Sequence, residues 1–419
     1  MARIVLSTFG STGDLNPFIA LGLTLRDRGH EVTFAVQDLF APAVESQGFA
    51  VRHVSGNVVA ALAQHTTQRQ WGASNPIPSL RALMRYGIMP TLDAQAQELR
   101  DACQGADLLV TSYGQLAGCF AAELAQIPWA TVALSPATVP SAYITSQPPP
   151  IDLPPNLQSL SNRVQWGIGS LVLGRIADRP INRVRARYHL KPIRESLWLG
   201  AASRQLVCVA CSPSFQPAPP DWPDCVRMTG FCFWDAPSTW EPPETLTAFL
   251  ADERPYVVVT AGSIAPDLQS AFASYFETSI KAITAAGARV LAIGLTEASQ
   301  FTGEGVLSLP FAPYSRIFPR AVAIIHHGGI GTTAQALRLG VPSLIVPWGF
   351  DQLYTAARIT TIGAGQFLFW RDYTPARAQK AISALLNEPS YRATARSLSE
   401  RIAHEDGVGT LCDAVLALL

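Results

Sequence analysis

The chain has 419 residues, more than the ~250–300 at which one hydrophobic core usually divides, so its length predicts two domains. Hydrophobic residues make up 48% of the chain and charged residues 15%, which excludes an intrinsically disordered protein. Lys plus Arg and Asp plus Glu both number 31, and this zero net charge argues against a nucleic-acid-binding protein that works through bulk positive charge.

The cysteines and the N-terminus bear on the cellular compartment. Seven cysteines are an odd and sparse set, unlike the disulfide framework of a secreted protein. Cys208 and Cys211 form a C-x-x-C, but the surrounding LVCVACS is typical of a buried strand, and no second pair follows to complete a zinc site. The chain starts directly with a strand pattern, and no apolar stretch reaches the ~20 residues that span a bilayer. We therefore expect a cytoplasmic protein without a metal.

The first half of the sequence alternates short β-branched runs with helical patterns. A helix is expected over residues 17–28, with Asn16 as its N-cap, Pro17 at its first position and Gly29 after its end. A second helix is expected over 117–126. Strands are expected at residues 4–7, 31–36, 49–54, 107–111, 129–134 and 205–210. This alternation predicts a parallel sheet with helices on both faces.

A second α/β run follows a proline-rich stretch. Strands are expected at residues 256–260, 289–293, 306–309, 321–325 and 343–346, and helices at 267–286, 332–339 and 351–358. We assign an N-terminal domain (1–215), a linker (216–245), a C-terminal domain (246–400) and a final helix (401–419) that packs back on the N-terminal domain. A ligand is expected between the domains, at the carboxyl ends of the strands.

The first strand leads into a glycine loop formed by Gly10, Ser11, Thr12, Gly13 and Asp14. An ionised carboxylate beside a helix N-terminus can accept a proton, so Asp14 is a candidate general base. An equally good interpretation is that Asp14 only caps the helix. The spacing is G-x-x-G and lacks the G-x-G-x-x-G of dinucleotide-binding proteins, which leaves an NAD-dependent oxidoreductase as a weak alternative.

A second glycine-rich turn follows the strand predicted at 321–325. It reads His326-His327-Gly328-Gly329-Ile330-Gly331-Thr332-Thr333 and opens a helix. Free main-chain N–H groups at a helix N-terminus bind anions, and the histidine and threonine side chains add hydrogen-bond donors. The pattern predicts a phosphate site, against the alternative of an ordinary tight turn with capping threonines.

Two further loops follow strands of the same half. Asp351 and Gln352 side by side suit hydrogen bonds to sugar hydroxyls, although an ordinary helix cap explains them locally. Gly262 and Ser263 follow the strand at 256–260. No D-x-D occurs, so the sequence indicates no dedicated Mg²⁺–diphosphate site.

These motifs resemble the GT-B-fold family 1 glycosyltransferases, in the branch that includes sterol glucosyltransferases, a rhamnosyltransferase and glycopeptide-antibiotic glycosyltransferases. The matching stretches are residues 1–55, with the early GSTGDLNP, and 255–370, with FAPY, HHGGIGTT, GVPSLIVP and Asp351-Gln352 in order. The resemblance implies two Rossmann-like, doubly wound parallel-sheet domains that face an interdomain cleft. It also implies inverting transfer of a sugar from a nucleoside diphosphate to an acceptor hydroxyl, without a metal or another cofactor. A UDP-sugar is the expected donor and a TDP-sugar the alternative.

The resemblance assigns roles to individual residues. Asp14 stands where plant members carry a catalytic His, and Ser112 stands where they carry the Asp that orients it. The plant Glu that holds the ribose is Gln335 here, which bears on the choice between uridine and thymidine. The remaining implied contacts are the nucleobase by Phe311, Ala312 and Pro313, the phosphates by Ser263, His327, Gly329, Gly331, Thr332 and Thr333, and the donor sugar by Trp348, Asp351 and Gln352.

The acceptor is expected on the N-terminal half, where residues 57–95 and 138–200 vary most from the family pattern. Their apolar side chains suit a lipid, sterol, carotenoid or polyketide, or else are ordinary core: Trp71, Met84, Tyr86, Met89, Tyr143, Trp166, Leu171 and Trp198. Residues 166–176, with Arg163 and Arg175 nearby, are a candidate for contact with a membrane surface.

Three other functions stay open at this stage. A nucleotide-sugar epimerase of GT-B-like architecture would need further acid–base residues and no acceptor cleft. An NAD-dependent oxidoreductase lacks its fingerprint. A non-catalytic protein that only binds nucleotide sugars would not need a base such as Asp14.

Overall fold

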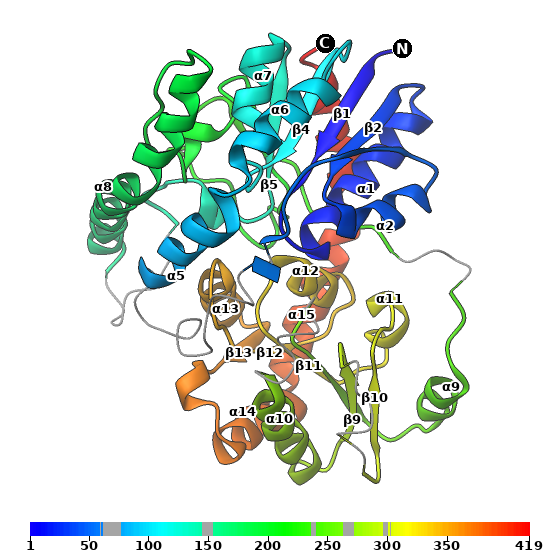
Figure 1. The fold of residues 1–419 in the computed structure, drawn as a ribbon. Helices are drawn as coiled ribbons and strands as arrows, with labels where there is room; N and C mark the ends of the chain where they lie inside the picture. The colour runs from blue at the N-terminus through cyan, green and yellow to red at the C-terminus, as the bar shows by residue number, and fades with distance from the viewer. Residues whose placement is uncertain are drawn as a thin grey trace. The chain divides into compact units, whose positions relative to one another are not determined.

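The computed structural model describes residues 1–58, 60–61, 77–144, 154–235, 240–262, 272–295, 301 and 303–419 (Figure 1). The chain forms two compact units. The first comprises Met1–Gln70, Asn75–Trp234 and Glu405–Leu419, and the second comprises Trp71–Ser74 and Asp235–His404. Predicted residues Trp71 and Ser263 lie outside the described residues.

The first unit is built on a seven-stranded sheet with the order β3-β2-β1-β4-β5-β6-β7, in which every neighbouring pair is parallel. The chain starts in the middle, builds outward through β2 and β3, and then returns to build on the other side of β1. The β1/β4 border is therefore the topological switch point, where open α/β sheets bind ligands. The strands are β1 Arg3–Ser7, β2 Glu31–Val36, β3 Ala50–His53, β4 Leu108–Ser112, β5 Trp129–Ala133, β6 Leu206–Val209 and β7 Val226–Met228.

Helices cover this sheet and close its core. Phe18 of α1 and Leu411 of α16 are almost fully buried in one apolar cluster with Phe34 of β2. Arg28 at the end of α1 also pairs with Asp413 of α16, so the C-terminal segment is an integral part of the first unit. The helices are α1 Thr12–Asp27, α2 Ala41–Glu45, α5 Ile77–Ala82, α6 Leu92–Ala102, α7 Gly118–Ala125, α8 Pro155–Arg187 and α16 Gly407–Leu416.

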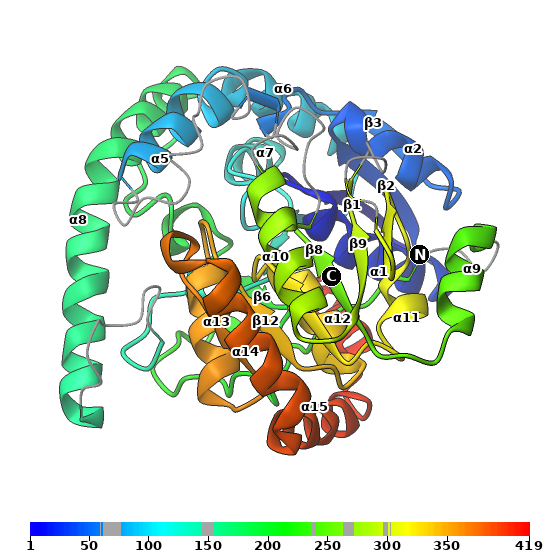
Figure 2. The same ribbon diagram turned by 90° about the horizontal axis from the view of Figure 1, so that it is seen from below.

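The second unit repeats the doubly wound plan, and Figure 2 labels its helices α9 to α15. Its six parallel strands have the order β10-β9-β8-β11-β12-β13. Its switch point is the β8/β11 border, and separate apolar clusters cover the two faces of the sheet. The strands are β8 Tyr256–Thr260, β9 Arg289–Ile293, β10 Val306–Leu309, β11 Ala323–His326, β12 Ser343–Ile345 and β13 Gly365–Phe367. The helices are α9 Glu244–Ala251, α10 Ala273–Ala285, α11 Tyr314–Ile317, α12 Ile330–Arg338, α13 Gln352–Thr361, α14 Pro375–Asn387 and α15 Pro389–Ile402.

The predicted pair of parallel α/β domains is confirmed, and β2, β8, β9 and β10 have the predicted bounds. The predicted start of the first helix is wrong. Helix α1 begins at Thr12, not at Pro17, because Ser11 and Asp14 form a capping box in which they satisfy each other's main-chain N–H groups. Pro17 therefore lies inside the helix.

The predicted linker also differs from the structure. Residues 216–234 belong to the first unit, since β7 lies within them and pairs with β6. A three-residue edge strand between prolines has too little periodicity to stand out in the sequence.

Candidate active site

Asp14 lies at the switch point of the first unit, in the first turn of α1 directly after β1. The main-chain N–H of Ser11 donates to Asp14 Oδ2 over 2.7 Å, and the Ser11 hydroxyl donates to the same oxygen over 3.0 Å. A Cβ on Gly10, whose φ is +133°, would lie 2.4 Å from Oδ2, so only glycine allows the carboxylate this position. The carboxylate is thus fixed through one oxygen.

Neighbouring polar residues hold the loop that carries Asp14 against β4. The N–H of Phe9 donates to Ser112 Oγ over 3.1 Å, and Gln115 Nε2 donates to Ser7 Oγ over 3.2 Å. Ser112, which stands where plant members carry the orienting Asp, therefore anchors the main chain of the loop. This joins the carboxyl ends of β1 and β4 around the carboxylate.

The environment of Asp14 alters its acidity. Burial raises the pKa of this half-buried carboxyl, and the hydrogen bonds from Ser11 partly oppose the effect; the net pKa lies above the ordinary aspartate value. A carboxylate with a raised pKa is a stronger base than an exposed one, which suits proton abstraction near neutral pH.

His327 occupies the switch point of the second unit, one residue after β11. Its imidazole fills the space beside two glycines: a Cβ on Gly262 would lie 2.4 Å from His327 Cε1, and a Cβ on Gly329 would lie 2.3 Å from Nε2. The ring centroid of Trp348 lies 6.1 Å from that of His327 on another side. The glycines of this turn therefore make room for an imidazole as well as for the main chain.

Both histidines of the turn are neutral. Burial lowers the pKa of His327 to about 4, and burial together with His327 lowers the pKa of His326 to about 3. His326 Nδ1 accepts from the N–H of Gly328 over 3.1 Å, so His326 shapes the turn. Within the described residues His327 Nδ1 is buried without a hydrogen-bond partner. A neutral imidazole still carries one N–H group that can donate a hydrogen bond.

Helix α12 starts at Ile330, with Gly329 as its N-cap. Its first intrahelical bond is from the N–H of Thr333 to Gly329 O, so the N–H groups of residues 330–332 point out of the helix without such a partner. Gly331 is exposed and Thr332 is 8% exposed. Thr333 is fully buried and its hydroxyl donates back to Gly329 O over 3.0 Å, so its side chain supports the helix start.

The loop between β12 and α13 carries the residues predicted to contact the donor sugar. Gln352 Oε1 accepts from the N–H of Trp348 over 2.9 Å and from that of Gly349 over 3.1 Å. The side chain is only 5% exposed, so its carbonyl holds the loop in place. Asp351 is the half-buried N-cap residue of α13.

The segment predicted to bind a nucleobase follows β10. Phe311 is 57% exposed and packs edge-on against Trp240 at 6.5 Å between ring centroids. Ala312 and Pro313 are buried. Of these three predicted residues, Phe311 alone offers an accessible ring face.

The structure also forms a polar cluster that the sequence did not predict. Gln335 Nε2 and Arg338 Nη1, one turn apart on α12, both donate to Asp235, over 3.4 and 3.0 Å. Gln335 Oε1 is buried without a partner among the described residues. Asp235 lies about 100 residues away in the sequence, so no local motif could place it beside Gln335.

The predicted acceptor residues within the described part of the chain divide into three groups by burial. Met84 and Trp166 are buried, and Trp166 Nε1 donates to Ile144 O over 2.9 Å, so both are core residues. Tyr143 and Leu171 are 58% and 60% exposed. Tyr86, Met89 and Trp198 are half-buried.

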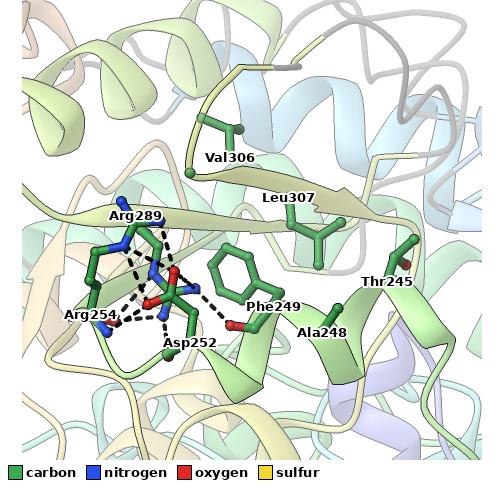
Figure 3. Close-up of a pocket in the computed structure, with 9 residues that line it drawn as sticks. Thr245, Ala248, Phe249, Asp252, Arg254, Arg289, Val306 and Leu307 are labelled. Atoms are coloured by element: carbon green, nitrogen blue, oxygen red, sulfur yellow. Dashed lines mark hydrogen bonds and ion pairs between the residues drawn. The ribbon is translucent and has the colours of Figure 1, made fainter.

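A pocket of about 290 Å³ opens at the opposite end of the second sheet, beside the first residues of β9 and β10 (Figure 3). Arg289 is directed at the carbonyls of Phe249, Asp252 and Arg254 over 2.6–2.7 Å. Asp252 pairs with Arg254 at 2.7 Å. The charged side chains that line this pocket are thus bonded to one another or to main-chain carbonyls, and the pocket lies away from the switch point.

Among the described residues, no cluster of three or more His, Cys, Asp or Glu could hold a metal, and no helix has the length and apolarity to cross a membrane.

Two family models match the two units. Residues 4–144 match the glycosyltransferase family 28 N-terminal domain, and residues 295–410 match the C-terminal domain of erythromycin biosynthesis protein CIII-like proteins. The match boundaries include the Asp14 loop in one model and the His327 turn in the other.

Proteins that align over nearly the whole chain are also glycosyltransferases. O-mycaminosyltylonolide 6-deoxyallosyltransferase from Streptomyces fradiae is 33% identical, over 98% of this chain and 96% of its own length. Sterol 3-beta-glucosyltransferase from Leptosphaeria maculans is 29% identical over 96% of this chain, which spans 28% of that protein. The solved structure of glycosyltransferase VinC in complex with DTDP is 20% identical, covers 99% of both chains and has a TM-score of 0.69.

Proposed function

Because the chain belongs to the GT-B-fold family 1 glycosyltransferases, we propose that it moves a sugar, with inversion, from a nucleoside diphosphate to a hydroxyl of an apolar small molecule. One observation carries this proposal. The switch point of the first unit presents a fixed carboxylate of raised pKa, and that of the second unit presents an imidazole with a helix N-terminus.

The chemistry follows from where charge develops. The acceptor oxygen must lose its proton as it attacks the anomeric carbon, and Asp14 Oδ1 takes this proton while Oδ2 stays bound to Ser11. The bond to the diphosphate breaks, and its leaving oxygen gains negative charge. The N–H groups of residues 330–332 and the imidazole of His327 stabilise that charge. A single displacement of this kind inverts the anomeric configuration.

The remaining donor contacts are assigned by accessibility. We assign the exposed ring of Phe311 to the nucleobase and Asp351, which follows the loop that Gln352 holds, to the donor-sugar hydroxyls. VinC was solved with DTDP and the Streptomyces fradiae relative is a 6-deoxyallosyltransferase, which favours a TDP-sugar over the UDP-sugar expected from the sequence. The relatives are named for O-mycaminosyltylonolide and sterols, which supports an apolar polycyclic or macrocyclic acceptor.

A ligand screen tests the proposal. Thermal shift and calorimetry with TDP, UDP, GDP and NAD should give a clear rise in melting temperature with TDP, a smaller rise with UDP, and none with NAD. A TDP-sugar with a panel of macrolide and sterol acceptors should then give a glycoside of inverted configuration by nuclear magnetic resonance. Stabilisation by NAD alone would overturn the proposal. Epimerisation of the donor without an acceptor would favour the epimerase hypothesis, which the two relatives and the solved structure described above do not support.

A further inference from the structure

Helix α8 turns a row of large aliphatic side chains toward solvent. Successive members are three or four residues apart, so they lie on one face of the helix, along roughly 21 Å at 1.5 Å per residue. We call this row the α8 stripe. Its members and exposed fractions are Leu157 47%, Leu160 58%, Val164 50%, Ile168 59% and Leu171 60%.

The opposite face of α8 is firmly packed, so the orientation of the stripe is fixed. The Trp166 ring meets that of Trp198 at 4.7 Å, and its Nε1 donates to Ile144 O. Asn162 is 2% exposed and donates to Ala142 O over 2.9 Å. A helix on a protein surface normally presents polar residues outward, whereas the stripe exposes large aliphatic side chains. Large exposed apolar rows of this kind mark interaction surfaces.

The charges of α8 are almost all positive. Arg163 lies beside the stripe, and Arg175, Arg179 and Arg183 follow it toward the C-terminal end of the helix; all four are exposed. Asp178, the single acidic residue of α8, accepts from the N–H groups of Glu195 and Ser196 over 2.9 Å. Its negative charge is therefore engaged on the side of the protein body.

We propose that the α8 stripe lies in the surface of an anionic lipid bilayer, with the arginines at the level of the phosphates. Aliphatic side chains with arginines beside them match the two layers of such a surface, acyl chains and anionic headgroups. A symmetric contact centred on the stripe would instead place Arg163, beside the central Val164, near its own copy, and like charges oppose that arrangement. This inference is independent of sugar transfer, and it would bring the protein to the phase in which apolar molecules accumulate.

Vesicle flotation with the full-length protein tests the inference. The protein should bind vesicles of phosphatidylcholine with phosphatidylglycerol, bind vesicles of phosphatidylcholine alone much more weakly, and dissociate at high salt. The double variant Leu160→Glu/Ile168→Glu should bind at least about 10-fold more weakly. The double variant Arg175→Ala/Arg179→Ala should bind anionic vesicles about 25-fold more weakly, at about fivefold per arginine. Leu39→Glu, at an apolar residue that is 44% exposed outside α8, should bind like the unchanged protein.

Two outcomes would overturn the inference. One is equal binding of the unchanged protein and the Leu160→Glu/Ile168→Glu variant to anionic vesicles, or equal binding to neutral and anionic vesicles. The other is a dimer in sedimentation velocity that this variant makes monomeric, without vesicle binding, which would assign the stripe to self-association. Unchanged melting temperatures would show that these exposed substitutions leave the fold intact.

Discussion

Ser11 and Asp14 are joined through a single carboxylate oxygen: the N–H and the hydroxyl of Ser11 both donate to Asp14 Oδ2. The other oxygen, Oδ1, receives no hydrogen bond from another residue within the described part of the chain. One side chain therefore caps α1 and still presents a free proton acceptor. The two interpretations left open by the sequence, helix cap and general base, are compatible in this geometry.

Substitutions at Asp14 separate the two roles. Asp14→Asn keeps an oxygen that can accept from Ser11 but has no basicity, so kcat should fall at least ~10²-fold with little change in melting temperature. Asp14→Ala should lose a similar factor in kcat and also about 1 kcal/mol of stability, since the capping box is lost. Steady-state kinetics and thermal unfolding of both variants check this. Near-normal turnover in Asp14→Asn would exclude the residue as the base.

The pH dependence of kcat/KM should report the same carboxyl. Asp14 must be ionised to accept a proton, so activity is lost as the pH falls through its pKa, and burial places that acid limb above the ordinary aspartate range. The Ser11 hydroxyl stabilises the anion, so Ser11→Ala should move the limb to higher pH. Thr12→Ala, at the exposed neighbour, is the matched control. A limb that moves to lower pH in Ser11→Ala would contradict the assignment.

Nucleoside diphosphate binding should depend on His327 and on the space around it. His327→Ala removes a donor to the phosphates, and the affinity for TDP by calorimetry should fall about 10-fold, as expected for a hydrogen bond to a charged group. Gly329→Ala should have a comparable effect, because its Cβ would lie 2.3 Å from His327 Nε2 and displace the ring. His404→Ala, at an exposed histidine of the same unit, is the control. Unchanged TDP affinity in His327→Ala would remove the histidine from the site.

The sequence predicted the strands that carry the site better than the contacts that build it. Parallel strands buried on both faces are nearly continuous apolar runs, such as YVVVT in β8, which are visible without any tertiary information. The carboxyl ends of these runs located the Asp14 loop and the His327 turn. The capping box was missed because Pro17 resembled a first helical position, although Ser11 and Asp14 already have the spacing of the box.

Other features depend on residues that are distant in the sequence. The buried position of Gln352 Oε1 and the pairing of Asp235 with Gln335 and Arg338 exist only once the chain is folded. The sequence indicated the α8 stripe only in part, through the apolar residues 166–176 and the arginines near them. Which face of the helix is buried was decided by Asn162 and Trp166, whose partners lie before the helix.

The neutral histidine pair should make the fold sensitive to acid. The pKa values of His326 and His327 fall to about 3 and about 4 in the folded protein, against 6.5 as the ordinary value. Between pH 6.5 and about 4 the unfolded chain therefore binds more protons than the folded chain, and the free energy of unfolding decreases as the pH is lowered.

The variant His326→Asn tests this prediction, because it keeps an acceptor for the Gly328 N–H but cannot titrate. Its urea unfolding should depend less on pH in this window, by up to about 1.4 kcal/mol per pH unit. Comparing the two proteins at each pH cancels the contribution of the carboxyl groups, and His404→Asn is the control. Parallel stability curves for the unchanged protein and His326→Asn would show that His326 binds protons equally well in the folded and unfolded chain.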